Sequence, residues 1–155
     1  MQVTATEDVA APIDHVFSEL TDFETFERRA LRRGIDVRRT FRAGFPEIGD
    51  GWEAKFRFRG KERTARIALE QLDPPQAMQF SGACGGLETV TQIELLPLSL
   101  NRTRVTLLFK MHPNTLSARL LVQTFKLARS NINKKLKARM SDYARAIESK
   151  VPKSA

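Results

Sequence analysis

The amino-acid sequence predicts an α+β protein in which a curved antiparallel β-sheet of about seven strands wraps around a long C-terminal helix. Two changes of hydrophobic period support this fold class. The period falls from near 3.6 to 2 at Ile35, and a helical period returns after Asn114. Short turns separate the alternating segments between these points, which favours antiparallel pairing. A chain of 155 residues is long enough for one domain with a single core.

A strand over residues 2–9 and two short helices are predicted to open the chain. Pro12 suits the first turn of the first helix. The apolar stripe of that helix comprises Ile13, Val16, Phe17 and Leu20. We expect Thr21 and Glu24 to form a capping box for the second helix, and Gly34 to end it as the C-terminal cap.

Six strands are predicted to follow, each with one apolar and one polar face. In the clearest segment, 52–59, aromatic and small residues alternate without a fault with Glu, Lys and Arg. Turns are predicted at residues 60–61, 73–75 and 82–86, where Gly and Pro gather. The sheet would therefore have one dry side and one wet side.

The C-terminal segment has the pattern of one long helix of about 35 residues. Its main apolar stripe comprises Leu121, Phe125, Ala128, Ile132, Leu136, Met140, Tyr143 and Ile147. Leu116, Leu120 and Leu127 lie on the opposite side of its first half. That half is predicted to be buried on two sides, bent relative to the rest, or presented to a partner. We assign residues 1–150 to one domain and 151–155 to a disordered tail.

Composition excludes several classes of protein. The lone Cys84 allows no internal disulfide or thiolate metal site, and with only two histidines we expect no metal and no cofactor. No apolar run approaches the roughly 20 residues that span a bilayer, and the start lacks the features of a signal peptide, so we expect a cytoplasmic protein. No nucleophile elbow, P-loop or dinucleotide fingerprint is present.

Two segments carry a resemblance to a known superfamily: residues 7–17, Glu-Asp-Val-Ala-Ala-Pro-Ile-Asp-His-Val-Phe, and residues 20–23, Leu-Thr-Asp-Phe. With the order of elements, they resemble the helix-grip fold of the START-like (SRPBCC) superfamily, the polyketide cyclase/dehydrase and lipid-transport group. Residues 23–34 and 56–61 more narrowly resemble an uncharacterised bacterial branch. The resemblance implies a cavity between sheet and C-terminal helix, but it does not choose between carriers, receptors and cyclases.

The inward positions would line such a cavity with mainly apolar side chains. The candidate ligand-binding residues are Glu7, Arg39, Trp52, Phe56, Phe58, Ile67, Met78, Phe80, Thr89, Thr91, Phe109 and Phe125. The alternative is that these side chains simply fill the core. We hypothesise that the two charges, Glu7 and Arg39, pair with each other or with the polar end of a ligand, and that Thr89 and Thr91 add hydroxyls. A bulge or an edge position that lets each charge reach solvent is the alternative.

Binding or transport of a small hydrophobic or lipid-like ligand is the function that these observations favour. We identify no catalytic residue: His15 and His112 are both expected to face water, and Cys84 lies in a Gly-rich turn. One alternative is a cyclase- or dehydratase-like enzyme in which Glu7, Arg39 or the threonines position a polyketide-type substrate. Another is an interaction adaptor, or an oligomer, that uses the leucines of the C-terminal helix.

The positive charge of the protein indicates one further kind of partner. The net charge is +8, and the basic residues on the wet face are Lys55, Arg57, Arg59, Arg66, Arg104 and Lys110. They could contact an anionic membrane surface, although a solvated face that resists edge pairing is the favoured explanation. Nucleic acid is the weaker option, because the aromatic side chains that would stack on bases point inward.

Overall fold

Seven strands and four helices make up the chain in a computed structural model, which describes residues 1–42 and 44–152. The strands are β1 (Gln2–Val9), β2 (Asp36–Arg39), β3 (Gly51–Phe58), β4 (Lys61–Asp73), β5 (Ala77–Cys84), β6 (Leu87–Ser99) and β7 (Arg102–Pro113). The helices are α1 (Ile13–Leu20), α2 (Phe23–Arg32), α3 (Leu116–Leu127) and α4 (Arg129–Ser149). The predicted α+β class and order of elements are confirmed.

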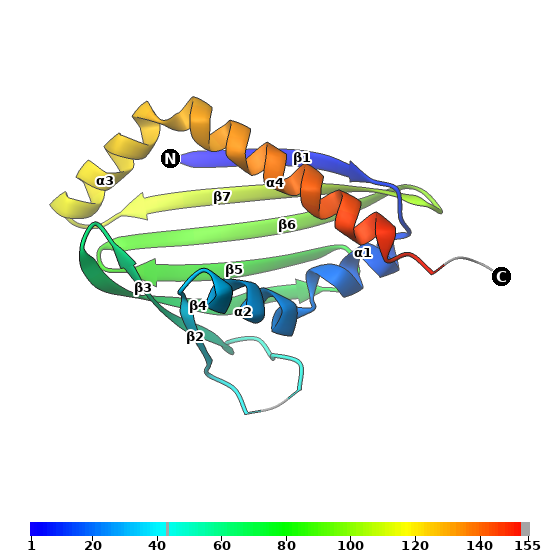
Figure 1. The fold of residues 1–155 in the computed structure, drawn as a ribbon, viewed down its shortest axis with the longest axis horizontal. Helices are drawn as coiled ribbons and strands as arrows, with labels where there is room; N and C mark the ends of the chain where they lie inside the picture. Colours follow the sequence, from blue (N-terminus) through cyan, green and yellow to red (C-terminus); the bar gives the residue numbers. More distant parts are fainter. Residues whose placement is uncertain (43, 153–155) are drawn as a thin grey trace.

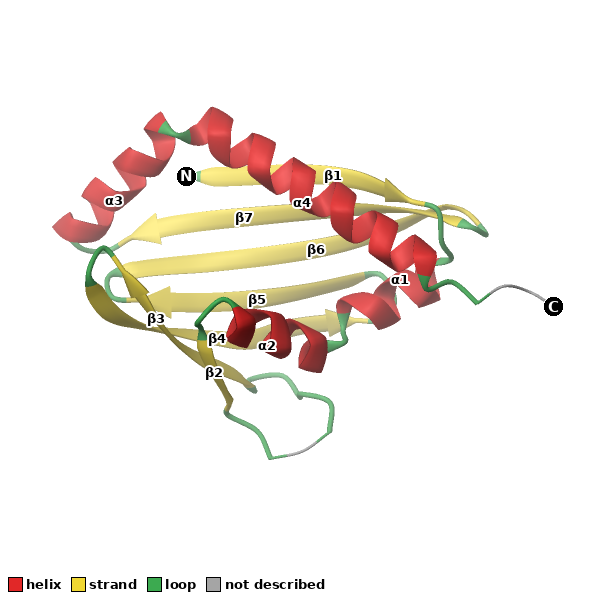
Figure 2. Ribbon diagram, viewed as in Figure 1, coloured by secondary structure: helices red, strands yellow, loops and turns green. Residues whose placement is uncertain are grey.

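All seven strands belong to one antiparallel sheet, in the order β1-β7-β6-β5-β4-β3-β2. The register places the predicted dry side on a single face: Trp52 lies opposite Ile67, and Thr91 lies between Phe80 and Phe109 on the neighbouring strands. The helices cross this inner face, as Figures 1 and 2 show. Strands β1 and β2 form the two edges of the sheet, which matters for the charges that they carry.

The long C-terminal helix is bent at Ala128 into α3 and α4 (Figure 2). Ala128 has φ −95° and ψ 11°, outside the α-helical range. The second helix, α4, packs mainly along β1, whereas α3 turns away toward the end of β7. Of the three predicted outcomes for this half, the bend is therefore confirmed.

The best-packed part of the core lies where α1, β1, β7 and the end of α4 meet. Its buried members are Val9, Ala11, Val16, Leu95, Val105, Ala144 and Ile147. Thr103, the buried polar residue of this region, donates its hydroxyl to the carbonyl oxygen of Ala11 at 2.9 Å. Val151, the first residue of the predicted tail, packs against the same cluster. Positions 153–155 lie outside the described residues.

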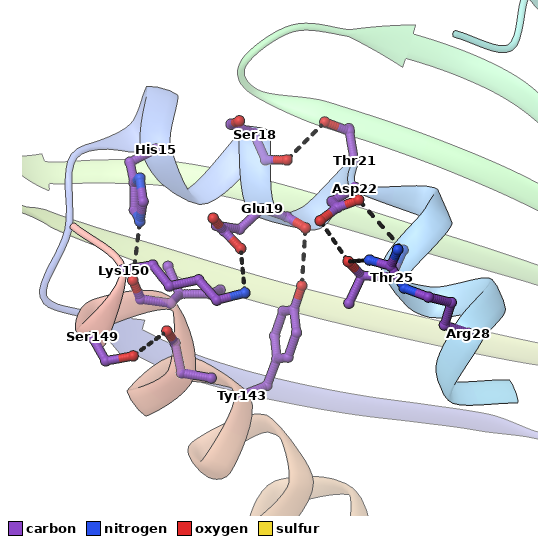
Figure 3. A network of polar contacts seen from close by, with 12 residues as sticks. His15, Ser18, Glu19, Thr21, Asp22, Thr25, Arg28, Tyr143, Ser149 and Lys150 are labelled. Carbon is purple, nitrogen blue, oxygen red and sulfur yellow. Dashed lines mark hydrogen bonds and ion pairs between the residues drawn. The ribbon is translucent and has the colours of Figure 1, made fainter. Parts of the chain in front are cut away.

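The start of α2 differs from the prediction by one residue. Asp22, and not Thr21, is the N-cap: its carboxylate accepts from the backbone N–H of Thr25 at 3.4 Å and from the Thr25 hydroxyl at 2.6 Å (Figure 3). The Thr25 hydrogen bond lowers the pKa of Asp22. Thr21 instead donates its hydroxyl back to Phe17 at 2.9 Å and so closes α1. Gly34, with φ 81°, ends α2 as predicted.

Helix α1 is tied to α4 by polar contacts that Figure 3 shows together. The Nε2 atom of His15 lies 3.0 Å from the carbonyl oxygen of Ile147, so the prediction that His15 faces water is wrong. The Tyr143 hydroxyl donates to the backbone carbonyl of Glu19 at 3.0 Å, and Lys150 pairs with the Glu19 carboxylate at 3.4 Å. The end of α4 thus contacts α1 at His15 and Glu19, whereas Asp14 and Ser18 stay exposed.

Candidate functional site

A cavity of about 700 Å³ lies between α2, α4 and the inner face of β1, β6 and β7. Its apolar wall comprises Leu20, Phe26, Ala30, Ile35, Ile93, Val105, Leu107 and Met140. Alternation along the strands aims the strand members of this wall inward, and Leu107 lies directly opposite Ile93. The Phe26 and Tyr143 rings, from α2 and α4, meet at 5.7 Å across it. We call this cavity the grip pocket.

Three arginines lie at the rim of the grip pocket: Arg29 and Arg33 on α2, and Arg139 on α4. All three are exposed, and none forms an ion pair within residues 1–42 and 44–152. The guanidinium of Arg29 stacks over the Tyr143 ring at 5.5 Å. The rim therefore carries three arginines and one carboxylate, that of Asp142, which pairs with Arg145 at 3.6 Å.

Two polar side chains reach the interior of the grip pocket. Glu7 is half-buried on β1, opposite Val105, and its carboxylate has no ion-pair partner in the described part of the chain. Burial raises the pKa of Tyr143 to about 12, so its hydroxyl is neutral near pH 7. That hydroxyl already donates to Glu19, which gives it a structural role. The interior thus offers apolar surface and a single carboxylate.

The hypothesis that Glu7 pairs with Arg39 is wrong. Glu7 lies on one edge strand and Arg39 on the other, so five strands separate them. Arg39 binds Glu27 of α2 instead, with its Nε at 2.6 Å and its Nη2 at 3.0 Å from the two carboxylate oxygens. The sequence alone does not reveal this partner, because Glu27 lies on α2 and periodicity does not show how that helix lies on the sheet.

Glu27 also accepts a hydrogen bond from the indole N–H of Trp52 at 2.9 Å. Burial alone would raise the pKa of Glu27, but the hydrogen bonds from Arg39 and Trp52 and the charge of Arg39 outweigh burial, and the pKa lies below its usual range. The bond to Glu27 in turn raises the pKa of Arg39. Both groups are therefore charged near pH 7 and join α2 to the β2 edge.

Trp52 and Phe80 pack in an aromatic cluster beneath α2, outside the grip pocket. The Phe23 ring lies 5.0 Å from Trp52 and 6.2 Å from Phe80, and Phe41 meets Trp52 edge-on at 5.7 Å. Met78, on the same strand as Phe80, is 2% exposed. Phe80 and Met78 line none of the described cavities, and Trp52 lies outside the grip pocket.

The other predicted residues are spread over the inner face. Those that line none of the described cavities are Phe56, Phe58, Thr91, Phe109 and Phe125. Ile67 and Thr89 line a second hollow of about 910 Å³. Trp52 and outward-facing side chains of the neighbouring strand positions also line it. Of the twelve predicted residues, Glu7 is the one that lines the grip pocket.

Part of the inner face stays open. The molecule exposes 10220 Å², against about 7,900 Å² expected for a protein of its mass. Phe58 and Ile67 are 36% and 37% exposed. The helices therefore cover the inner face of the sheet incompletely.

The rim arginines are not among the residues that the sequence predicts as a site. A signal was available, because Phe26, Ala30 and Arg33 recur at spacings of four and three residues and so share one face of α2.

Neither a metal cluster nor a membrane-crossing helix is found. No group of three His, Cys, Asp or Glu side chains within the described ranges could hold a metal ion. None of the helices that the structure describes is long and apolar enough to cross a membrane.

No family model and no curated protein matches this chain. Solved structures do match. A protein from Thermus thermophilus superposes with a TM-score of 0.67 at 16% identity, over 96% of this chain and 98% of the other. The Zhui aromatase/cyclase from a Streptomyces species gives 0.65 at 15% identity, over 98% and 99%. A START superfamily protein from Mycobacterium smegmatis gives 0.59 at 15% identity, over 92% and 98%. The chain therefore has the helix-grip fold of START-like proteins.

Proposed function

We propose that this protein binds a small apolar ligand with an acidic group in the grip pocket. The observation that carries the proposal is the pocket itself, whose volume of about 700 Å³ lies within the range of small-molecule sites. Apolar walls suit the body of such a ligand, and the rim arginines suit an acidic group at the mouth. The START superfamily protein and the aromatase/cyclase of similar fold support a ligand-binding use of this architecture.

Most of the affinity would come from the apolar wall. Burial of about 300 Å² of apolar ligand surface contributes about 7 kcal/mol before the costs of ordering. Exposed ion pairs contribute about 0–1 kcal/mol each, so the arginines would orient the ligand more than they hold it. The wall and the rim can therefore be tested separately.

Filling the pocket is expected to abolish most of the binding. Ala30 lies in the wall on α2, and Ala30→Trp would place an indole inside the cavity. We expect affinity for cis-parinaric acid, a fluorescent fatty acid, to fall by about tenfold or more, because the indole occupies the space of the chain. The control is Ala138→Trp, at an exposed position of α4 outside the pocket. Equal affinity in the two variants, both folded by circular dichroism, would overturn the proposal.

Neutralising the rim is expected to remove the preference for an acid. In the double variant Arg33→Gln, Arg139→Gln we expect affinity for cis-parinaric acid to fall by about tenfold, while affinity for its methyl ester stays unchanged. The control, Arg32→Gln with Lys137→Gln, removes the same charge from side chains that do not line the pocket. If this control lowers acid binding as much, the effect is one of net charge and the role of the rim is refuted.

A cyclase- or dehydratase-like reaction is the second candidate. Glu7 favours it, because an inner carboxylate without an ion pair could take a proton from a bound substrate. Arg39, however, is engaged by Glu27, and Thr91 lies outside the pocket. Incubation with a polyketide-type substrate, followed by mass spectrometry for loss of water, tests this candidate. The cyclase- or dehydratase-like candidate requires that the natural sequence turns the substrate over and that Glu7→Gln abolishes this turnover.

A further inference from the structure

The outer face of α3 carries three strongly exposed leucines. Leu116, Leu120 and Leu127 are 74%, 62% and 91% exposed. At 100° per residue they fall within about 40° of one another around the helix. Ala118 and Val122, on the opposite side of α3, are 5% and 3% exposed and face the protein. The helix is thus apolar on two sides, and the protein covers one of them.

The charges along α3 and the first half of α4 are all positive. From Leu116 to Ser141 the sequence holds seven basic residues and no Asp or Glu. They are Arg119, Lys126, Arg129, Lys134, Lys135, Lys137 and Arg139, and all of them are exposed. A second copy of the chain that covered the leucines would bring two such clusters together. An anionic surface would instead neutralise them.

The end of the sheet at which α3 begins carries further exposed apolar and basic side chains. The β3–β4 turn lies at the same end, because β3 and β4 pair antiparallel and β7 leads directly into α3 (Figure 1). Phe58 at this turn is 36% exposed, with the guanidiniums of Arg59 and Arg63 over its ring at 5.4 and 5.6 Å. Exposed apolar side chains and cations therefore occur together on both elements.

We propose that α3 docks this protein on an anionic lipid membrane. The leucines enter the boundary between headgroups and acyl chains, and the basic side chains contact lipid phosphates. The outer sheet face is a poorer surface, since Arg104 is paired with Asp8 at 2.8 Å and acidic residues alternate with the basic ones there. The bend at Ala128 is what turns α3 away from the sheet and leaves its outer face free.

Vesicle co-flotation of the whole protein, without added ligand, tests this docking. In about 0.1 M salt we expect binding to phosphatidylcholine vesicles that contain about 30% phosphatidylglycerol, and about tenfold weaker binding to phosphatidylcholine alone. The double variant Leu120→Ser, Leu127→Ser is expected to lose about tenfold in affinity for the anionic vesicles. Because it keeps every charge, a loss would show that binding is not the attraction of a +8 protein alone.

The matched control is Leu96→Ser with Leu100→Ser. These leucines are 56% and 89% exposed near the β6–β7 turn, at the opposite end of the sheet. The control should bind anionic vesicles like the natural sequence. Equal binding by both double variants would overturn the proposal, as would binding that ignores phosphatidylglycerol. A natural sequence that is dimeric in light scattering, and becomes monomeric in the α3 variant only, would assign the leucines to a second copy and overturn it too.

Discussion

Gly51→Ala is expected to lower the free energy of unfolding by about 3 kcal/mol or more. A Cβ at this position of β3 would overlap the backbone carbonyl of Ile67 on β4. The Gly51 backbone is also held by Thr40, whose hydroxyl accepts from its N–H at 2.8 Å and whose N–H donates to its carbonyl at 2.9 Å. Room for one methyl group therefore requires β3 to move from β4 or from Thr40, and either movement breaks hydrogen bonds.

Urea unfolding measures this loss, with the fluorescence of Trp52, the chain's single tryptophan, as the signal. Gly82→Ala on β5 is the control. Its Cβ would meet the hydroxyl of Thr89 and no backbone atom at so short a distance, and that side chain can change rotamer. We expect the control to lose less than about 1 kcal/mol. Equal losses would show that backbone overlap is not the cause.

The sheet could be predicted from the sequence because each strand carries its own signal. Alternation along 52–59 alone indicates which side chains of β3 face inward. The bend at Ala128 gave no such signal, because the apolar stripe passes through Ala128 in phase and would suit a straight helix equally. The leucines on the other side of α3 were the one hint of it.

The site was harder to predict, because a cavity depends on which inner positions the helices cover. Trp52 and Phe80 face inward as expected, yet Phe23 of α2 packs on both of them. Glu7 lines the grip pocket together with residues of α2, α4, β6 and β7, elements that are far apart in the sequence. The partner of Arg39 is likewise set by how α2 lies on the sheet, which periodicity does not encode.

Glu27→Gln is expected to lower the free energy of unfolding by about 1.5 kcal/mol at pH 7. Glutamine keeps the shape and one acceptor, but it loses the charge that meets Arg39 and cannot accept from Arg39 and Trp52 as a carboxylate does. The side chains of Glu27 and Arg39 are 23% and 26% exposed, so water replaces the lost bonds only in part. Glu24→Gln is the control: Glu24 lies 3.9 Å from Arg39 but is 72% exposed, and its loss should stay below about 0.5 kcal/mol.

The pH dependence of this effect follows from the direction of the Glu27 pKa. Because that pKa is lower in the folded protein than its ordinary value of 4.5, the folded state binds the proton more weakly than the unfolded state. The stabilisation by Glu27 is fully present above the ordinary pKa, and it is lost as the pH falls through the folded value. The difference in unfolding free energy between the natural sequence and Glu27→Gln should therefore shrink from pH 7 to about pH 3 in urea titrations. A constant difference over this range would mean that the glutamine lowers the unfolding free energy through its shape. The charge of Glu27 would then not stabilise the contact between α2 and the β2 edge.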